Sequence, residues 1–174
     1  LFFLQSCTKI DDTVYDKYPA NDFYGTPVGQ NAALASVSSQ LNNYWGANYA
    51  GFDNCWYDVN CFSTDEQVIP HRNTGDWQLD FSILYKHTWT CSTPGIINNV
   101  WNWLYNSVFK ANLAVELLTK ANPAEPAEIA EAKVLRAFFY YLLIDDFGNV
   151  PFYTENNLTV DKIPQSNRKD VFNF

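Results

Sequence analysis

The sequence predicts an all-α fold with tetratricopeptide-like helical hairpins and long irregular loops. Two long segments in the second half of the chain carry apolar residues every three or four positions, which is the period of an α-helix with one buried face. A short break separates them, so the two helices must lie antiparallel as a hairpin. The composition agrees, because 47% of the 174 residues are hydrophobic and 17% are charged. This balance suits a packed core and excludes a disordered chain.

The first predicted helix begins at Pro27, because Thr26 is a good N-cap and proline is favoured at the first helical position. The helix is expected to end near Gly46, where the apolar period stops. Its apolar positions have helical spacing and are Leu34, Val37, Leu41, and Tyr44 or Trp45.

Residues 46–95 have no clear period and are predicted to be irregular. They are rich in Gly, Asn, Asp and Pro, and they also hold several Trp and Tyr residues. A stretch of about fifty residues is far longer than an ordinary connection between helices. Because loops on a rigid scaffold often carry recognition, this stretch is the predicted functional surface.

The strongest helical pattern of the chain follows Pro94 and Gly95. It predicts one long helix as the first member of the hairpin. Trp101 and Tyr105 lie on its apolar face, so we expect them to pack in the core rather than contact a ligand. The apolar positions are Ile97, Val100, Trp101, Leu104, Val108, Ala111, Val115 and Leu118.

The second helix of the hairpin has two possible starts in the sequence. Asn122 could act as N-cap with Glu125 completing a capping box, or Pro126 could be the first helical residue. The helix is expected to end at Phe147, within two residues, because Gly148 suits a left-handed cap. Its apolar face consists of Ala132, Leu135, Phe138 or Phe139, and Leu142.

The charge balance and the spacing of possible metal ligands argue against two classes of function. The chain has 11 Lys and Arg residues against 19 Asp and Glu residues, a net charge of −8, which repels the phosphates of nucleic acids. We therefore expect no nucleic-acid partner. There is no Cys-x-x-Cys pair, and His71 and His87 lack metal-site spacing, so we expect no metal and no cofactor.

No catalytic site is predicted, and the protein is not expected to be an enzyme. Asp65 and Glu66 are adjacent on an extended segment and would point to opposite sides, which does not suit the carboxylate pair of a glycosidase. Arg136, Asp145 and Asp146 lie on a helix bounded by core positions, where we expect a solvated or salt-bridged face.

The first residues resemble the end of a bacterial lipoprotein signal peptide. Residues 1–6 would be the remnant of that peptide, with the small residue Ser6 directly before Cys7. Cys7 would then be the lipidated residue, and residues 7–25 would form a lipidated tether, since acyl chains hold a protein at a membrane. No apolar stretch is long enough to span a bilayer as a helix. The alternative is a buried strand that ends in an ordinary cysteine.

A local disulfide is a second hypothesis about the cysteines. If Cys7 is acylated, an odd number of cysteines is left in a chain exported to an oxidising space. Cys55 and Cys61 are close enough in sequence to form a bridge, which would leave Cys91 as a free thiol.

The order and spacing of many short pieces resemble the N-terminal region of SusD/RagB lipoproteins. The resemblance covers nearly the whole chain, and residues 26–174 would form this SusD-like region. The pieces are Thr64-Asp65-Glu66, Pro70, Arg72, Asp76-Trp77, His87-Thr88-Trp89, Trp101 to Tyr105, Ala111-Asn112, Glu131-Ala132, Leu135-Arg136-Ala137, Tyr140-Tyr141, Phe147-Gly148-Asn149-Val150-Pro151, Pro164, Arg168 and Val171.

This resemblance implies a surface-exposed outer-membrane lipoprotein that captures a nutrient and covers a TonB-dependent transporter of the SusC type. Most members of the family bind glycans and some take peptides. Asp11 and Asp12, just after Cys7, are similar to the acidic signal that directs such lipoproteins to the outer face of the Bacteroidota outer membrane. Members are much longer than 174 residues, and this chain has no Met, so we expect it to be the front part of a longer protein.

Glycan recognition is expected from residues 45–77, which hold the aromatic part of the irregular segment. Sugars present an apolar C–H face and a rim of hydroxyl groups, so their sites combine flat aromatic platforms with polar groups at the edge. Packing of the same aromatic residues against the helices is the alternative role for each of them. The candidate platforms are Trp45, Trp56, Tyr57 and Trp77, and the candidate rim residues are Asn54, Arg72, Asn73 and Asp76.

Three other functions are alternatives to glycan capture. A peptide-binding receptor of the RagB kind would use the same fold. A general tetratricopeptide scaffold that grips a protein partner would have regular repeats and no long aromatic insertion. A secreted glycoside hydrolase would show a carboxylate pair at a fixed separation.

Overall fold

The predicted all-α class is confirmed by the computed structural model. It describes residues 23–41, 56–69, 78–90, 95–121, 125–160 and 162–174, with the backbone alone for residues 78–80. Most of these residues are helical. The strands β1 (Val150–Pro151) and β2 (Gln165–Ser166) form a short antiparallel pair in which Val150 lies opposite Ser166.

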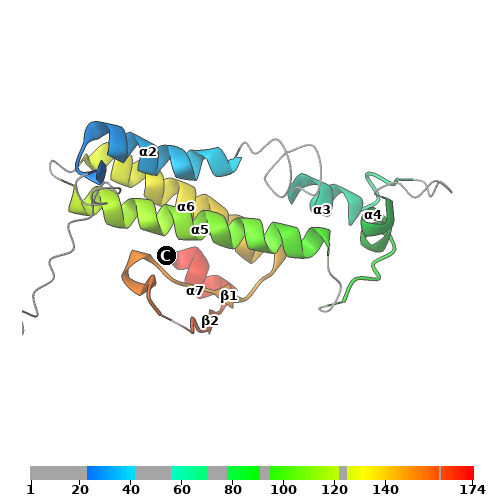
Figure 1. Cartoon of the computed structure of the whole chain (residues 1–174). Coiled ribbons are helices and arrows are strands. Elements are labelled where there is room, and N and C mark those ends of the chain that lie inside the picture. The colour runs from blue at the N-terminus through cyan, green and yellow to red at the C-terminus, as the bar shows by residue number, and fades with distance from the viewer. Residues whose placement is uncertain (1–22, 42–55, 70–77, 91–94, 122–124, 161) are drawn as a thin grey trace, which may run out of the picture.

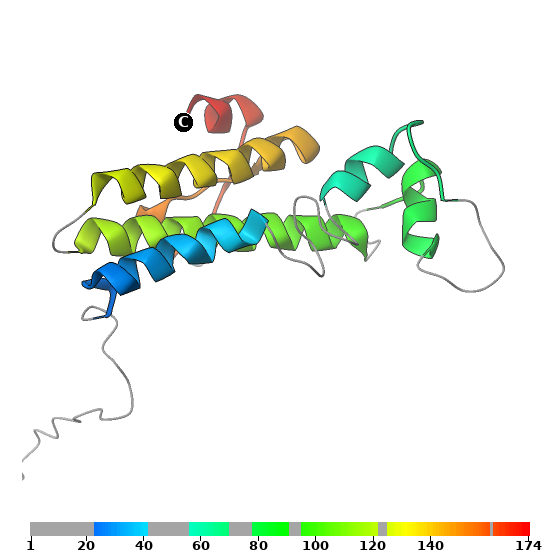
Figure 2. The same ribbon diagram turned by 90° about the horizontal axis from the view of Figure 1, so that it is seen from above.

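The centre of the molecule is the predicted helical hairpin. Helices α5 (Ile96–Lys120) and α6 (Pro126–Asp146) lie side by side and antiparallel along most of their length (Figures 1 and 2). The apolar period of α5 faces α6, and Leu104, Val108 and Val115 are fully buried there. Each such side chain stabilises the fold by about 1.5–3 kcal/mol relative to an exposed position. The hairpin is therefore the main source of core burial.

The structure decides between the two possible starts of α6. Pro126 is the first helical residue and Glu125 occupies the N-cap position, as in the second alternative. The helix ends at Asp146, and Phe147 is the C-cap residue. Gly148 has a φ of 72°, the left-handed conformation that was predicted for it. Of the two adjacent phenylalanines, Phe139 is fully buried.

Helix α2 (Pro27–Ser38) begins as predicted and ends earlier than predicted. The Thr26 hydroxyl accepts a hydrogen bond from the Gly29 N–H at 3.1 Å and so caps the helix. The α-helix does not continue to Gly46, because it passes at Ser39 into the 3₁₀ turn η1 (Ser39–Leu41). The Ser39 hydroxyl donates to the Ser36 carbonyl at 2.9 Å, a local bond that competes with regular helix geometry.

The prediction that residues 46–95 are wholly irregular is wrong. Helices α3 (Trp56–Phe62) and α4 (Gln78–Tyr85) lie in this stretch, at the end of the molecule where α5 begins (Figure 1). They enclose a second small core, in which Phe81, Leu84 and Ile96 are buried. Each helix is too short for an apolar period to be visible in the sequence. Part of the stretch that was predicted to be irregular thus forms a packed helical unit, which consists of α3 and α4.

The remaining elements cover the hairpin from two sides. Helix α2 lies along one side, and the segment from β1 to α7 (Arg168–Asn173) lies on the other (Figure 1). This second segment also contains the 3₁₀ turn η2 (Glu155–Asn157). The hairpin therefore forms a central layer, with the α3–α4 unit at one of its ends.

Candidate functional site

Two of the predicted ligand residues, Trp56 and Tyr57, lie at the start of α3. The two residues are adjacent in the sequence, but their side chains differ in burial. Trp56 is partly buried and packs against the main core, whereas the Tyr57 side chain is 48% exposed. The other candidates lie outside the described residues, and they are Trp45, Asn54, Arg72, Asn73, Asp76, Trp77 and the lipidation residue Cys7.

Trp56 belongs to the contact between α3 and the end of α6. The Asn60 side chain, one turn along α3, donates to Asp146 Oδ1 at 3.3 Å and to the Trp56 carbonyl at 3.1 Å. Burial raises the pKa of Asp146 to about 6, and the Asn60 and Trp56 side chains act in the opposite direction. The packing role that was weighed for Trp56 is thus the one its surroundings favour, and Tyr57 is the accessible aromatic residue of α3.

Cys61 is a free thiol and is buried on α3. The disulfide to Cys55 that the sequence suggested is therefore not formed in this structure, and Cys55 itself lies outside the described residues. The Cys61 thiol lies next to the Tyr57 hydroxyl and raises the pKa of that tyrosine. The small core between α3 and α4 encloses this part of α3 through Phe62, which contacts Phe81 at a ring separation of 4.7 Å.

A second exposed aromatic residue, Trp89, follows α4. Its side chain is 40% exposed, and its ring lies 5.2 Å from the ring of His87. The His87 Nε2 atom is 2.8 Å from the Ser63 carbonyl oxygen, which joins the end of α4 to the end of α3. Trp89 was noted in the aromatic-rich stretch but was not among the predicted ligand residues. Among the described residues of the α3–α4 unit, Tyr57 and Trp89 are therefore the large aromatic side chains that are exposed.

Arg136 was expected on a solvated or salt-bridged face, and the structure shows it buried and ion-paired. The side chain is 4% exposed, so it does not lie on a solvated face, although the expected salt bridge is present. Its guanidinium donates to Asn112 Oδ1 at 2.8 Å and to the Glu155 carboxylate. Burial alone would raise the pKa of Glu155, but its own backbone N–H and the Arg136 guanidinium hold that pKa below its usual value.

Tyrosine hydroxyl groups continue this polar network along the hairpin. The Tyr140 hydroxyl donates to the Tyr153 carbonyl at 2.7 Å and accepts from the Tyr153 N–H at 3.0 Å. The Tyr105 hydroxyl donates to the Pro151 carbonyl at 2.8 Å. Burial raises the pKa of both Tyr105 and Tyr140, so both remain protonated donors. These bonds hold the segment after α6 against the hairpin, which is a structural role.

Trp101 packs as predicted from its position on the apolar face of α5. Its ring contacts Tyr105 at 4.7 Å and Phe147 at 4.9 Å between centroids, the latter edge to face. Both Trp101 and Tyr105 are partly buried against the main core. Both residues therefore have the packing contacts expected of them.

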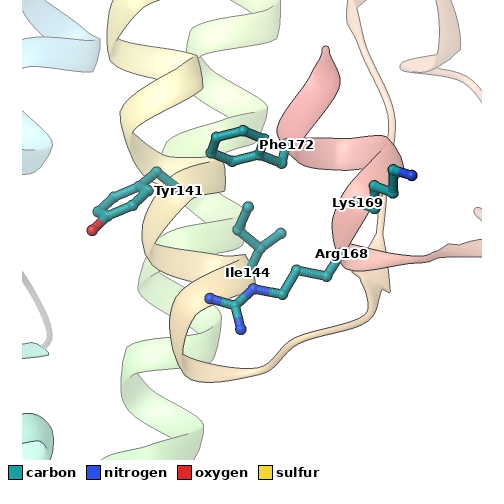
Figure 3. A pocket seen from close by; sticks show the side chains of 5 residues that line it. All are labelled: Tyr141, Ile144, Arg168, Lys169 and Phe172. Atoms are coloured by element: carbon teal, nitrogen blue, oxygen red, sulfur yellow. The ribbon is translucent and has the colours of Figure 1, made fainter.

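An open apolar groove lies between α6 and α7 (Figure 3). Its volume is about 380 Å³, and its lining combines apolar side chains with two cationic ones. Phe172, on α7, is 72% exposed at its edge. Arg168 forms an ion pair with Asp145 at 3.3 Å. The lining residues are Tyr141, Ile144, Arg168, Lys169 and Phe172.

Comparison with known proteins identifies the family of this chain. Residues 27–172 match the SusD-like family described as "Starch-binding associating with outer membrane". The chain belongs to the SusD-like family. The match begins at the first residue of α2 and ends within α7, so it covers every element of the fold described above.

Two curated SusD-like proteins, both from Formosa agariphila, are similar to this chain. SusD-like protein P25 is 24% identical over 184 aligned positions, which cover 98% of this chain and 33% of that protein. SusD-like protein P38 is 34% identical over 77 residues, which cover 42% of this chain and 15% of that protein. The chain thus spans about a third or less of the length of each SusD-like relative. No solved structure matches it significantly.

The described residues of this SusD-like chain show neither a metal-binding cluster nor a membrane-spanning helix. No group of three or more His, Cys, Asp or Glu side chains in the described ranges could hold a metal ion. In the same ranges, no helix combines the length and the apolar character that crossing a bilayer requires.

Proposed function

We propose that this protein is a surface-exposed outer-membrane lipoprotein that binds a glycan for uptake through a TonB-dependent, SusC-like transporter. The observation that carries the proposal is the SusD-like family match over residues 27–172, with its description of starch binding and association with the outer membrane. The ligand class is starch, another polysaccharide or an oligosaccharide. The protein acts by binding and uses neither a catalytic residue nor a cofactor.

The proposed ligand surface is the end of the molecule that carries the α3–α4 unit. Tyr57 supports this assignment, since its side chain is exposed while its neighbour Trp56 packs inward. An exposed aromatic ring offers a flat apolar face to the C–H face of a sugar. Polar groups at the edge of such a platform would hydrogen-bond the sugar hydroxyls. The proposed further contacts are Trp45, Arg72, Asn73, Asp76 and Trp77, from the same stretch of sequence.

Membrane attachment is proposed to run through Cys7. Acyl chains on this cysteine would anchor the protein, and residues 7–25 would act as the tether that keeps the helical region clear of the membrane. The acidic pair Asp11 and Asp12 would direct the protein to the outer face. Mass spectrometry of the membrane-extracted protein tests this proposal, because the expected N-terminal peptide begins at an acylated Cys7. An unmodified Cys7 inside a longer peptide would contradict it.

The partner and ligand classes are tested together on the native outer membrane. The tagged full-length protein is solubilised in mild detergent and purified, and the co-purifying proteins are identified by mass spectrometry. We expect a TonB-dependent transporter in roughly equal amount. The same preparation is then applied to arrays of glycans and of peptides. Binding to peptides alone would make the protein a RagB-like peptide receptor, and a protein partner without either ligand would favour a general tetratricopeptide scaffold.

A further inference from the structure

The C-terminal cap of α4 has a non-glycine residue in the left-handed conformation. The His87 N–H donates to the Leu84 carbonyl at 3.0 Å, and the Thr88 N–H donates to the Ile83 carbonyl at 3.0 Å. This pair of bonds is the Schellman motif, which places the residue after the helix in the left-handed conformation. That residue is His87, with a φ of 52°. Among the non-glycine residues of the described ranges, it is the one with a positive φ.

A glycine would make the same turn without strain, so the histidine ring needs an explanation. Non-glycine residues in the left-handed conformation carry a conformational cost and persist where their surroundings hold them. The His87 ring makes two contacts that glycine could not make. Its Nε2 atom is 2.8 Å from the Ser63 carbonyl oxygen, and its ring lies against Trp89 at 5.2 Å with an interplanar angle of 59°. Both contacts fix the direction of the chain after α4.

This turn places the Trp89 ring against His87 at the surface of the protein. One part of the Trp89 ring contacts His87, while 40% of the side chain remains exposed. The turn rests on the second core, where Leu84 is fully buried and Phe81 nearly so. A tryptophan on such a base loses little conformational freedom when a ligand stacks on it, which favours binding.

We propose that Trp89 is a stacking platform for a sugar ring of the glycan ligand and that His87 is its positioning residue. This inference rests on the proposed function and adds a contact that the sequence did not predict. The exposed indole offers a flat apolar face of the kind that the C–H face of a pyranose packs against. The exposed Thr88 lies between the two aromatic residues in the sequence.

The platform is tested by titrating the full-length soluble protein with maltoheptaose, cellohexaose and xylohexaose in a calorimeter. For the oligosaccharide that the wild type binds, we expect Trp89→Ala to weaken binding at least about fivefold, since stacking on an aromatic ring is worth roughly that or more. Trp89→Phe retains a flat ring and is expected to bind with an intermediate affinity. Phe109→Ala is the matched control, because Phe109 is exposed to a similar extent on α5, and it should bind like the wild type.

The positioning role is tested by His87→Gly and His87→Asn. Both residues tolerate the left-handed conformation, so both variants should fold with the helical circular dichroism spectrum of the wild type. We expect both His87→Gly and His87→Asn to weaken oligosaccharide binding, because neither side chain reaches the Ser63 carbonyl as His87 Nε2 does or places an aromatic ring against Trp89. Wild-type affinity in His87→Gly would overturn the positioning role.

The outcomes separate this inference from the function on which it rests. If the wild type binds an oligosaccharide and Trp89→Ala binds it with the same affinity, the platform role of Trp89 is overturned and the proposed function still stands. A wild type that binds none of the three oligosaccharides, nor soluble starch, overturns the proposed function and the platform together. Equal melting curves for Trp89→Ala and the wild type show that a loss of affinity is not a loss of folding.

Discussion

At the scale of single residues, the buried ion pair of Arg136 has the largest expected effect on stability. Its guanidinium bonds both Asn112 on α5 and Glu155 in the segment after α6, so one side chain joins three parts of the chain. Removing one partner of a buried pair leaves the other polar groups without compensation, which is strongly destabilising. The adjacent surface pair between Arg168 and Asp145 is exposed and has no such consequence.

We therefore expect Arg136→Met to lower the free energy of unfolding by about 3 kcal/mol. Arg168→Met is the matched control, and its cost should stay below about 1 kcal/mol. Urea denaturation followed by circular dichroism measures both values. Equal losses in the two variants would show that burial does not distinguish the two ion pairs.

The neighbouring carboxyl groups at the end of α6 give a pH prediction. Burial raises the pKa of Asp146 to about 6, compared with about 3.9 for an aspartate in an unfolded chain. The folded state therefore binds this proton more tightly than the unfolded state does. The stabilisation from the protonated carboxyl is fully present below about pH 4 and is lost as the pH rises through about 6.

Asp146→Asn should remove this pH dependence, because the amide stays neutral and can still accept from Asn60. We expect the variant to melt at a higher temperature than the wild type at pH 7.5, and the difference to close as the pH approaches 4. Asp145→Asn, one residue earlier and exposed, should shift the melting temperature little at either pH. Melting temperatures measured between pH 4 and 8 test this prediction. An Asp146→Asn variant that is no more stable than the wild type at pH 7.5 would contradict the raised pKa of Asp146.

At the scale of elements, local signals in the sequence predicted the start of α2 and the end of α6, and they left two possible starts for α6. Thr26 and Pro27 begin α2, Pro126 begins α6, and Gly148 follows its end. These residues act through local backbone geometry, which a sequence reveals directly. Helices α3 and α4 were missed because their stability comes from the second core, which brings residues distant in sequence together. The early end of α2 was missed because hydroxyl-to-carbonyl bonds leave no periodic signal.

Gly148 offers a clean test of such a local signal. A Cβ atom at this position would meet nothing within 4 Å, so the effect of a substitution comes from the backbone conformation alone. We expect Gly148→Ala to cost about 1–2 kcal/mol, because an L-residue is strained at a φ of 72°. Gly148→Asn should cost less, since asparagine tolerates this region. Chemical denaturation compares the two, and an alanine variant as stable as the asparagine variant would exclude conformational strain as the cause.

At the scale of the whole molecule, the hairpin and the family were predictable and the ligand surface was predictable only in part. The apolar periods of α5 and α6 define the hairpin, and the spaced motifs pointed to the SusD-like family that the match over residues 27–172 shows. Sequence position did not separate Trp56 from Tyr57, since burial depends on which side of α3 meets the hairpin. Trp89 belongs to a motif that pointed to the family, but the sequence did not predict its exposure, which depends on the turn at His87.

The whole account depends on glycan binding by the full-length protein, and calorimetric titration with soluble starch and defined oligosaccharides measures that property most directly. The account predicts saturable binding to at least one glycan, with an affinity that falls when exposed aromatic residues of the α3–α4 unit are replaced by alanine. The contradicting result would be a folded full-length protein that binds none of these glycans at any concentration tested.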